Sequence, residues 1–193
     1  MQEAKKVFLL AGSTTEPSVT KSTLKMIEKA LNEAGTEVVT LDLSLIDLPI
    51  FKVKASRPLV LKDYDEALVS SHSVVVATPD YHGSMAGSVK NWMDYYWQEF
   101  AGKLFGYVVS SHEKGLTVID QMRTAVRQCY GWSLPYGVSV TESDFDEARE
   151  TLLSSTLRLR VDCMVHDILD YGPLLQEQFI KNKGQRGFAT RYK

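Results

Sequence analysis

The chain has 193 residues, a formal net charge of -2, 44% hydrophobic residues and 24% charged residues. This length suits one domain spanning residues 1–193, which would bury roughly 70% of the surface exposed by the unfolded chain. The composition excludes a disordered or fibrous protein, and the balanced charge argues against a nucleic-acid partner.

The cellular location is predicted from what the sequence lacks. No apolar run approaches the ~20 residues of a membrane span, and Met1 to Lys6 lead directly into a short apolar run without the features of a signal peptide. Cys129 and Cys163 form neither a CxxC pair nor a disulfide framework. We therefore expect a cytoplasmic protein with no membrane partner.

The first half of the chain alternates strand and helix patterns. Residues 7–11 form an apolar run closed by Gly12-Ser13, as in a buried parallel strand. A helix is predicted from Pro17, placed in its first turn, to a stop at Gly35. A second strand (37–41), an ordered loop (42–58), a helix (61–70) and a third strand (73–78) follow, and the third strand ends abruptly in a loop at Pro79 to Gly83.

A helix predicted over residues 88–100 carries an unusual number of aromatic side chains. They occupy more than one helical stripe, so one face would be exposed unless a second subunit covered it. We therefore predict a homodimer or homotetramer formed through this aromatic helix. Its aromatic residues are Trp92, Tyr95, Tyr96, Trp97 and Phe100.

The remaining elements complete an α/β pattern. A strand (104–110), a helix (115–130), a fifth strand (134–141) and a last helix from Asp144 to about Asp170 are expected, with a solvated basic tail at 172–193. The alternative for this tail is an arm onto a neighbouring subunit. The pattern predicts a flavodoxin-like, doubly wound five-stranded parallel sheet of order 2-1-3-4-5 with helices on both faces. Ligands of such sheets bind beyond the strand carboxyl ends, between the first and third strands.

The loop after the first strand, residues 12–20, is suited to a phosphate. It supplies five hydroxyl side chains at the N-terminus of a helix, where backbone N–H groups and the helix dipole favour an anion. Neither GxGxxG nor the Walker lysine pattern is present. The alternative is a polar turn with a Ser/Thr cap.

The loop after the third strand is suited to a flat ring. Small residues let the backbone approach a ligand, and Tyr81 and His82 offer planar side walls for an isoalloxazine. The alternatives are a surface aromatic packed on the next helix for Tyr81 and a solvent-facing loop residue for His82.

Residues 78–95, TPDYHGSMAGSVKNWMDY, resemble the T-P-E-Y-x-G-S-x-x-G-x-L-K-N-x-x-D-W/Y signature of the NADPH-dependent FMN reductase family. Gly12, Ser13 and Ser18 resemble that family's G-S-x-R-x-x-S-x-N phosphate motif, and the element order agrees over about residues 5–170. The family includes flavin, quinone, chromate and azo-dye reductases. The resemblance implies bound FMN, NADPH or NADH as electron donor, and ping-pong hydride transfer to a small-molecule acceptor such as a flavin or quinone.

Several positions depart from the family pattern. Thr15 stands where arginine is common and Thr20 where asparagine is common, while Glu16 adds a like charge. A hydrogen bond to a charged group contributes about 1.5–3 kcal/mol, so the lost arginine would weaken FMN binding by roughly 10- to 100-fold unless Lys21 or a neighbouring subunit compensates. Asp80 replaces glutamate at a position expected to act mainly through its backbone.

The predicted site has no catalytic side chain, because the flavin would carry the chemistry. The four histidines show no metal-ligand spacing and no G-x-S-x-G elbow is present, so neither a metal site nor a serine hydrolase is expected. The rival interpretation is a flavodoxin-fold binding or regulatory protein with weakened or lost FMN affinity; a one-electron carrier is a further alternative. The predicted cofactor-binding residues are Ser13, Thr15, Ser18, Val19, Thr20, Pro79, Asp80, Tyr81, His82, Gly83, Ser110, Ser111 and His112.

Overall fold

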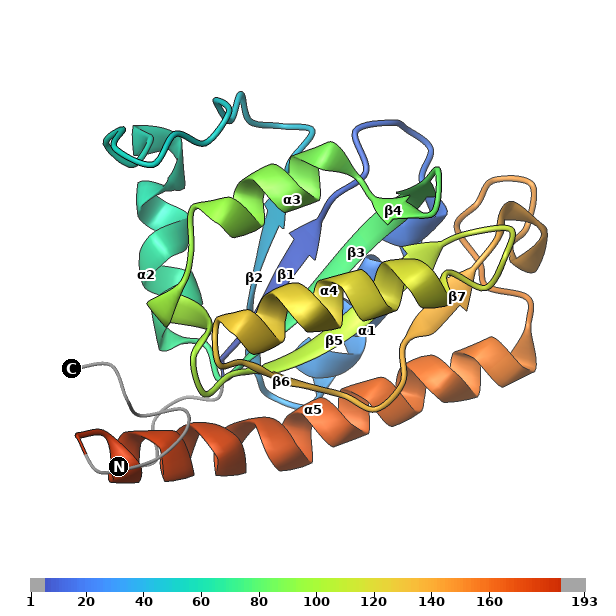
Figure 1. Cartoon of the computed structure of the whole chain (residues 1–193). Coiled ribbons are helices and arrows are strands. Elements are labelled where there is room, and N and C mark those ends of the chain that lie inside the picture. The colour runs from blue at the N-terminus through green and yellow to red at the C-terminus, as the bar shows by residue number, and fades with distance from the viewer. Residues whose placement is uncertain (1–5, 185–193) are drawn as a thin grey trace.

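The computed structural model describes residues 6–184 and has a parallel sheet at its centre (Figure 1). The strand order is β2-β1-β3-β5, followed by β6 and β7, which both pair with β5. The predicted order 2-1-3-4-5 is confirmed, because β6 and β7 together occupy the place of the fifth strand. The parallel strands are β1 (Lys6–Ala11), β2 (Glu37–Asp42), β3 (Ser73–Tyr81), β5 (Leu104–Ser110), β6 (Trp132–Ser133) and β7 (Val138–Val140).

The fifth strand is divided rather than continuous. Leu134 to Gly137 lie between β6 and β7 and include Pro135, which has no N–H to donate to a neighbouring strand. The fifth strand is therefore divided at the edge of the sheet, where a missing hydrogen-bond donor is tolerated.

Helices cover both faces of the sheet, as predicted (Figure 1). One face packs against α1 (Val19–Glu33) and α5 (Ser155–Asn182), and the other against α2 (Lys62–Ser70), α3 (Gly87–Asp94) and α4 (Leu116–Gln128). Because both faces are covered, Val7 to Leu10 and Val74 to Ala77 have no exposed surface. None of the helices that the structure describes is long and apolar enough to cross a membrane.

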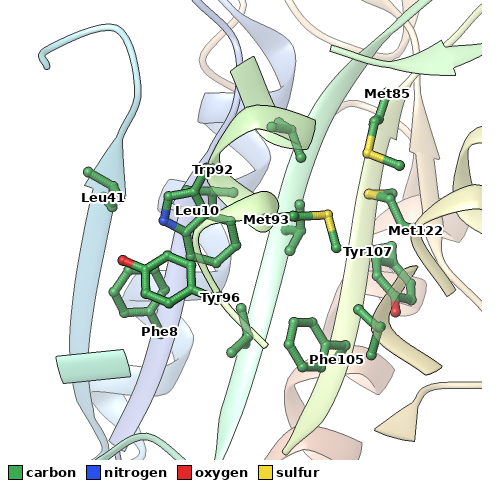
Figure 2. Packing of buried hydrophobic residues seen from close by; sticks show 14 of the residues in the cluster. Phe8, Leu10, Leu41, Met85, Trp92, Met93, Tyr96, Phe105, Tyr107 and Met122 are labelled. Carbon is green, nitrogen blue, oxygen red and sulfur yellow. The ribbon is translucent and has the colours of Figure 1, made fainter. Parts of the chain in front are cut away.

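The aromatic segment is two short elements instead of the predicted single helix. Helix α3 ends at Asp94, and a 3-10 turn, η2 (Gln98–Phe100), follows Trp97, whose φ and ψ of -140° and -75° leave the helical region. Helix α3 places Trp92 in the core, where it lies 5.9 Å from Phe8 between ring centroids (Figure 2). The break after Asp94 lets Tyr96 and Phe100 be buried as well.

The break also changes the basis of the predicted subunit contact. Tyr95 is half-buried because its hydroxyl donates to the Pro49 carbonyl at 2.8 Å and its ring packs edge-on against Phe51. Trp97, at 53% exposure, is the aromatic of this segment that is left largely open to solvent. Most of the expected apolar face is thus covered by the chain itself.

The last helix begins later than predicted. Thr141 and Asp144 form a capping box around a 3-10 turn, η3 (Glu142–Asp144), and α5 begins only after Ser154, whose hydroxyl accepts from the Leu157 N–H. Asp144, where the last helix was predicted to begin, therefore belongs to this turn instead.

The last helix also extends further than predicted, through the start of the expected basic tail to Asn182. At Gly172 it approaches the sheet so closely that a Cβ atom would lie 2.1 Å from the Ser73 hydroxyl oxygen. Of the basic residues assigned to the tail, Arg186, Arg191 and Lys193 lie outside the described residues.

Candidate functional site

The predicted site residues lie at the carboxyl ends of three neighbouring strands. Residues 12–18 follow β1, and residues 111–115 follow β5. Between them, the end of β3 pairs with β4 (Ser84–Met85) to form a hairpin. The Gly12 N–H donates to the Ala77 carbonyl at 2.8 Å, and Pro79 pairs with Ser110. The sheet therefore brings together segments separated by about a hundred residues in sequence.

The first segment, called here the phosphate loop (residues 12–18), begins at a position that requires glycine. A Cβ atom on Gly12 would lie 2.1 Å from Cγ2 of Val89 and 2.7 Å from the Ala77 carbonyl oxygen. The Gly12 carbonyl in turn accepts from the Ser88 hydroxyl at 3.0 Å. Close packing against α3 and β3 thus fixes where the phosphate loop starts.

The phosphate loop ends at the N-terminus of α1. Ser18 is the cap, and its hydroxyl lies 3.5 Å from the Lys21 amide and 2.8 Å from the Thr20 hydroxyl. Pro17, predicted to lie in the first helical turn, precedes the cap instead. Near its start, the Ser13 and Thr15 hydroxyls lie 3.3 Å apart.

Two backbone amides at this helix end fit an anionic ligand. Val19 and Thr20 are 5% and 1% exposed, and within residues 6–184 neither N–H has a protein acceptor. Backbone amides of a first helical turn need an acceptor from outside the helix, and the helix dipole favours one that is negatively charged. A phosphate monoester satisfies both requirements, so the residues fit the phosphate of FMN.

Lys21 lies beneath the phosphate loop, but its charge is already matched. Its ammonium group is 2.6 Å from Glu16 and 2.9 Å from Asp42, and it also donates to the Ser44 hydroxyl. Burial lowers the pKa of Lys21, but the hydrogen bonds and charges of the two carboxylates outweigh this and leave that pKa above its ordinary value. Lys21 therefore neutralises two acids instead of standing free for a ligand.

The second segment is a β-hairpin instead of the predicted irregular loop. Strand β3 continues to Tyr81, and Tyr81 pairs with Ser84 across a two-residue turn. The turn residues, His82 and Gly83, have φ values of 57° and 75°, as a type I′ turn requires. Thr78 secures its base by accepting from the Ala86 N–H at 2.9 Å.

The side chain of Asp80 joins the hairpin to the third segment. One carboxylate oxygen accepts from the Gly83 N–H at 2.8 Å, and the other accepts from the buried Ser111 hydroxyl at 2.7 Å. The Ser111 N–H donates to the Val140 carbonyl of β7. We predicted that Asp80 would act mainly through its backbone, whereas the structure gives its carboxylate two partners.

The tip of the hairpin is open on one side and supported on the other. Tyr81 is 48% exposed, and His82 and Gly83 are also exposed. Gln121 of α4 donates to the Gly83 carbonyl at 3.2 Å and accepts from the Ser84 hydroxyl at 3.0 Å. The hairpin is therefore a supported platform, with peptide groups and an aromatic ring accessible to a planar ligand.

The third segment contributes fewer candidate groups. Ser110 is half-buried at the end of β5, and His112 is exposed. Lys114 and Gly115 have positive φ values of 65° and 58°, and a Cβ on Gly115 would lie 2.7 Å from Cγ1 of Val109. Glycine is thus needed where this segment enters α4.

Sequence reasoning missed two polar residues that the structure brings to this region. Gln121 supports the hairpin, and Arg149, from the segment before α5, donates to the Pro17 carbonyl of the phosphate loop at 3.1 Å. Gln121 had no local signal, and Arg149 was hidden by the helix predicted from Asp144. Among residues 6–184, no group of three or more His, Cys, Asp or Glu side chains is arranged to hold a metal ion.

Comparison with known proteins identifies the family of the chain. A sequence model of the NADPH-dependent FMN reductase family matches residues 5–146. The FMN-dependent NADPH-azoreductase of Staphylococcus haemolyticus is 25% identical over 182 residues, covering 86% of this chain and 94% of the relative.

Solved structures show the same fold. An oxidoreductase from Corynebacterium diphtheriae aligns with a TM-score of 0.72 at 19% identity, covering 92% of this chain and 99% of its own. The flavoenzyme NAD(P)H:(acceptor) oxidoreductase FerB from Paracoccus denitrificans aligns with a TM-score of 0.70 at 16% identity, covering 91% and 98% of the two chains. With a family match over most of its length, the chain belongs to the NADPH-dependent FMN reductase family.

Proposed function

We propose that this protein binds FMN between the phosphate loop and the β3–β4 hairpin and passes electrons from NADPH or NADH to a small-molecule acceptor. The observation that carries the proposal is that the amides of the buried residues Val19 and Thr20 have no protein acceptor within residues 6–184, together with the exposed hairpin platform. One element suits a phosphate and the other a flat ring, and the sheet holds both at one edge.

The phosphate end is assigned to the first turn of α1. The amides of Val19 and Thr20 would donate to phosphate oxygens, and the hydroxyls of Ser13, Thr15 and Ser18 lie in the same segment. The Thr20 hydroxyl, 2.8 Å from that of Ser18, can rotate to donate to a ligand as well.

The ring end is assigned to Pro79 through Gly83, with Ser110, Ser111 and His112 on its neighbouring side. When bound, FMN supplies the hydride-transfer chemistry that protein side chains lack. The chain's own task is to position the ring, and Asp80 and Gln121 do this by fixing the hairpin tip. No side chain is assigned as an acid or base.

The exposed hairpin favours planar acceptors. Tyr81 and His82 leave room at the surface for a flat molecule to enter and leave, so one open face would serve the nicotinamide and then the acceptor in a ping-pong cycle. Quinones, free flavins, azo compounds and oxidised metal ions fit this requirement. The first experiment is therefore to titrate FMN into purified protein by absorbance and then to follow NADPH and NADH oxidation with each acceptor class.

A binding or regulatory protein is the second candidate. Glu16 favours this second candidate, because its carboxylate forms an ion pair with Lys21 and adds negative charge to the phosphate loop. A protein that binds no FMN at saturating concentration and oxidises neither nicotinamide would support this candidate and refute the enzyme.

The proposal includes a cytoplasmic homodimer or homotetramer that acts on small molecules and has no nucleic-acid partner. Trp97, at 53% exposure, is the aromatic that best supports a subunit contact through the Trp92–Phe100 segment. Light scattering after size exclusion would test this, since a Trp97→Gln variant should lower the measured mass of an assembly built on that contact. An unchanged assembly would place the contact elsewhere.

A further inference from the structure

We propose that Arg149 binds the FMN phosphate, in place of the arginine that the phosphate loop lacks at Thr15. The inference rests on the proposed function, because it assigns a further residue to the same phosphate site. Its starting point is a contact between segments 132 residues apart, in which Nη1 of Arg149 donates to the Pro17 carbonyl at 3.1 Å.

The guanidinium contacts the residue that leads into the N-terminus of α1. Pro17 immediately precedes the cap residue Ser18, and the unpaired N–H groups of Val19 and Thr20 come directly after it. An arginine bound to the Pro17 carbonyl therefore sits at the positive end of α1, where a phosphate dianion would most strongly attract it. Arginine also matches phosphate geometry with two parallel N–H donors, which Thr15 cannot provide.

The segment that carries Arg149 is held in place by the core and by backbone hydrogen bonds. Phe145 and Leu152 form a bridge across it and are 5% and 1% exposed. Between them, the Asp146 carboxylate accepts from the N–H groups of Glu150 and Thr151. Arg149 thus projects from a small, closed hairpin whose base is anchored in the hydrophobic core.

The backbone at Arg149 is itself unusual. Its φ of 58° lies in the left-handed region, which costs an ordinary residue roughly 1–2 kcal/mol relative to glycine. Glycine or asparagine would satisfy this turn with less strain, so the stability of the turn does not explain an arginine here. A role for the side chain does.

The other nearby cation is not equivalent. Lys21 is held by two carboxylates, Glu16 and Asp42, and is 6% exposed. Arg149 pairs with one carboxylate, that of Glu142 at 2.8 Å, whose side chain is 61% exposed. A surface ion pair of this kind contributes at most about 1 kcal/mol, so a phosphate can take the place of Glu142 at small cost.

The test compares FMN with riboflavin, which has the same ring but no phosphate. Fluorescence quenching of each flavin gives its dissociation constant for the wild type, Arg149→Gln, Arg149→Gly and a control variant. The control is Arg158→Gln, because within residues 6–184 the Arg158 guanidinium donates to the Leu153 carbonyl at 3.4 Å and makes no hydrogen bond to the phosphate loop.

We expect Arg149→Gln to weaken FMN binding by about 10- to 100-fold, the loss of one hydrogen bond to a charged group, with riboflavin affinity unchanged. Arg149→Gly should lose as much FMN affinity while keeping or raising the melting temperature, since glycine removes the backbone strain. Glu142→Gln should tighten FMN binding by releasing Arg149.

Each contrary result has a separate meaning. If Arg149→Gln binds FMN as the wild type does, Arg149 is not a phosphate ligand and the inference is overturned while the proposed function stands. If FMN and riboflavin weaken equally, the residue acts on the fold and the inference is also overturned. If the wild type binds neither flavin, both the inference and the proposed function are wrong.

Discussion

The two halves of the candidate site are built differently. The hairpin of Tyr81 to Ser84 is fixed mainly by its own backbone pairing and by Asp80, with Gln121 as its support from α4. The phosphate loop instead depends on distant segments: Val89 and Ala77 set its start, and Arg149 contacts its end.

This difference matches the sequence pattern. The hairpin lies in the long match to the family signature, whereas the phosphate loop departs from the family motif at Thr15 and Thr20. A region organised by local contacts can be identified from consecutive residues. A region completed by distant side chains lacks such a pattern in consecutive residues. It can still present the polar and charged groups that a ligand needs.

The largest effect is expected where the phosphate loop begins. Gly12→Ala places a methyl group 2.1 Å from Cγ2 of Val89 and 2.7 Å from a backbone carbonyl, and such overpacking costs about 3 kcal/mol of unfolding free energy. Gly83→Ala in the hairpin has its nearest neighbour 4.0 Å away, so only the left-handed backbone opposes it, at roughly 1 kcal/mol. Urea denaturation of both variants measures the contrast.

A reversed ranking would contradict the packing argument. Adding Val89→Ala to Gly12→Ala should recover part of the lost stability, because it removes the nearer of the two clashing atoms.

A pH effect on the free energy of unfolding is expected at Lys103, which lies outside both halves of the site. It changes stability without acting on flavin binding. Burial lowers the pKa of Lys103 to about 8, and this ammonium group donates to the Val69 and Ser71 carbonyls. Between pH 8 and its ordinary pKa of 10.5, the unfolded state binds more protons at this site than the folded state, so stability rises with pH.

The pH effect is measured against Lys103→Met, which lacks the titrating group. We expect the wild type to gain about 1.5 kcal/mol relative to this variant from pH 8 to about pH 9.5, as followed by urea denaturation. If the difference in unfolding free energy between the wild type and Lys103→Met does not change with pH, the pKa of Lys103 is not depressed.

A smaller effect is expected from the link between the hairpin and the third segment. Asp80→Asn keeps one oxygen acceptor but loses the charge that holds both Gly83 and Ser111, so about 1 kcal/mol of hydrogen bonding is removed. FMN and riboflavin affinities should fall together by about fivefold, because this residue acts on the ring end. Asp120→Asn is the control, because among residues 6–184 the Asp120 carboxylate forms a surface pair with Arg123 and has no hydrogen bond to the hairpin.

The contrast with Arg149 sharpens this prediction. If Asp80→Asn weakens FMN binding but not riboflavin binding, Asp80 influences the phosphate end. The division of the site into a ring half and a phosphate half would then be wrong.

The smallest effect is expected at Glu16. Its carboxylate is 67% exposed and would repel a phosphate, a like-charge interaction that is worth about 1 kcal/mol or less at the surface. Glu16→Gln should therefore tighten FMN binding about threefold and leave riboflavin unchanged. Weaker FMN binding would instead show that the Glu16 contact to Lys21 shapes the phosphate loop.

The fold was largely predictable because the three central parallel strands are rich in apolar residues. The runs 7–11, 73–78 and 104–110 identify β1, β3 and β5, and their alternation with helices gives the sheet order. The helix boundaries at Asp94 and Ser155 were not predictable in this way. Apolar spacing continues past Asp94 although the backbone turns, and acidic residues that resemble a helix start form a separate 3-10 turn.

The candidate site was predictable to the extent that its residues are consecutive. The loops after β1 and β3 were located from local sequence, although the hairpin pairing after β3 and the start of α1 after Ser18 were not predicted. The partners of Lys21 and the placement of Arg149 depend on contacts between distant segments, which residue spacing does not encode. The carboxylate role of Asp80 was missed for the same reason, since Ser111 is 31 residues away.

A crystal structure of the protein with FMN tests the central claim most directly. We expect phosphate oxygens within hydrogen-bond distance of the Val19 and Thr20 amides and the ring against Pro79 to Gly83. A crystal saturated with FMN that holds the cofactor elsewhere, or holds none, would contradict the account.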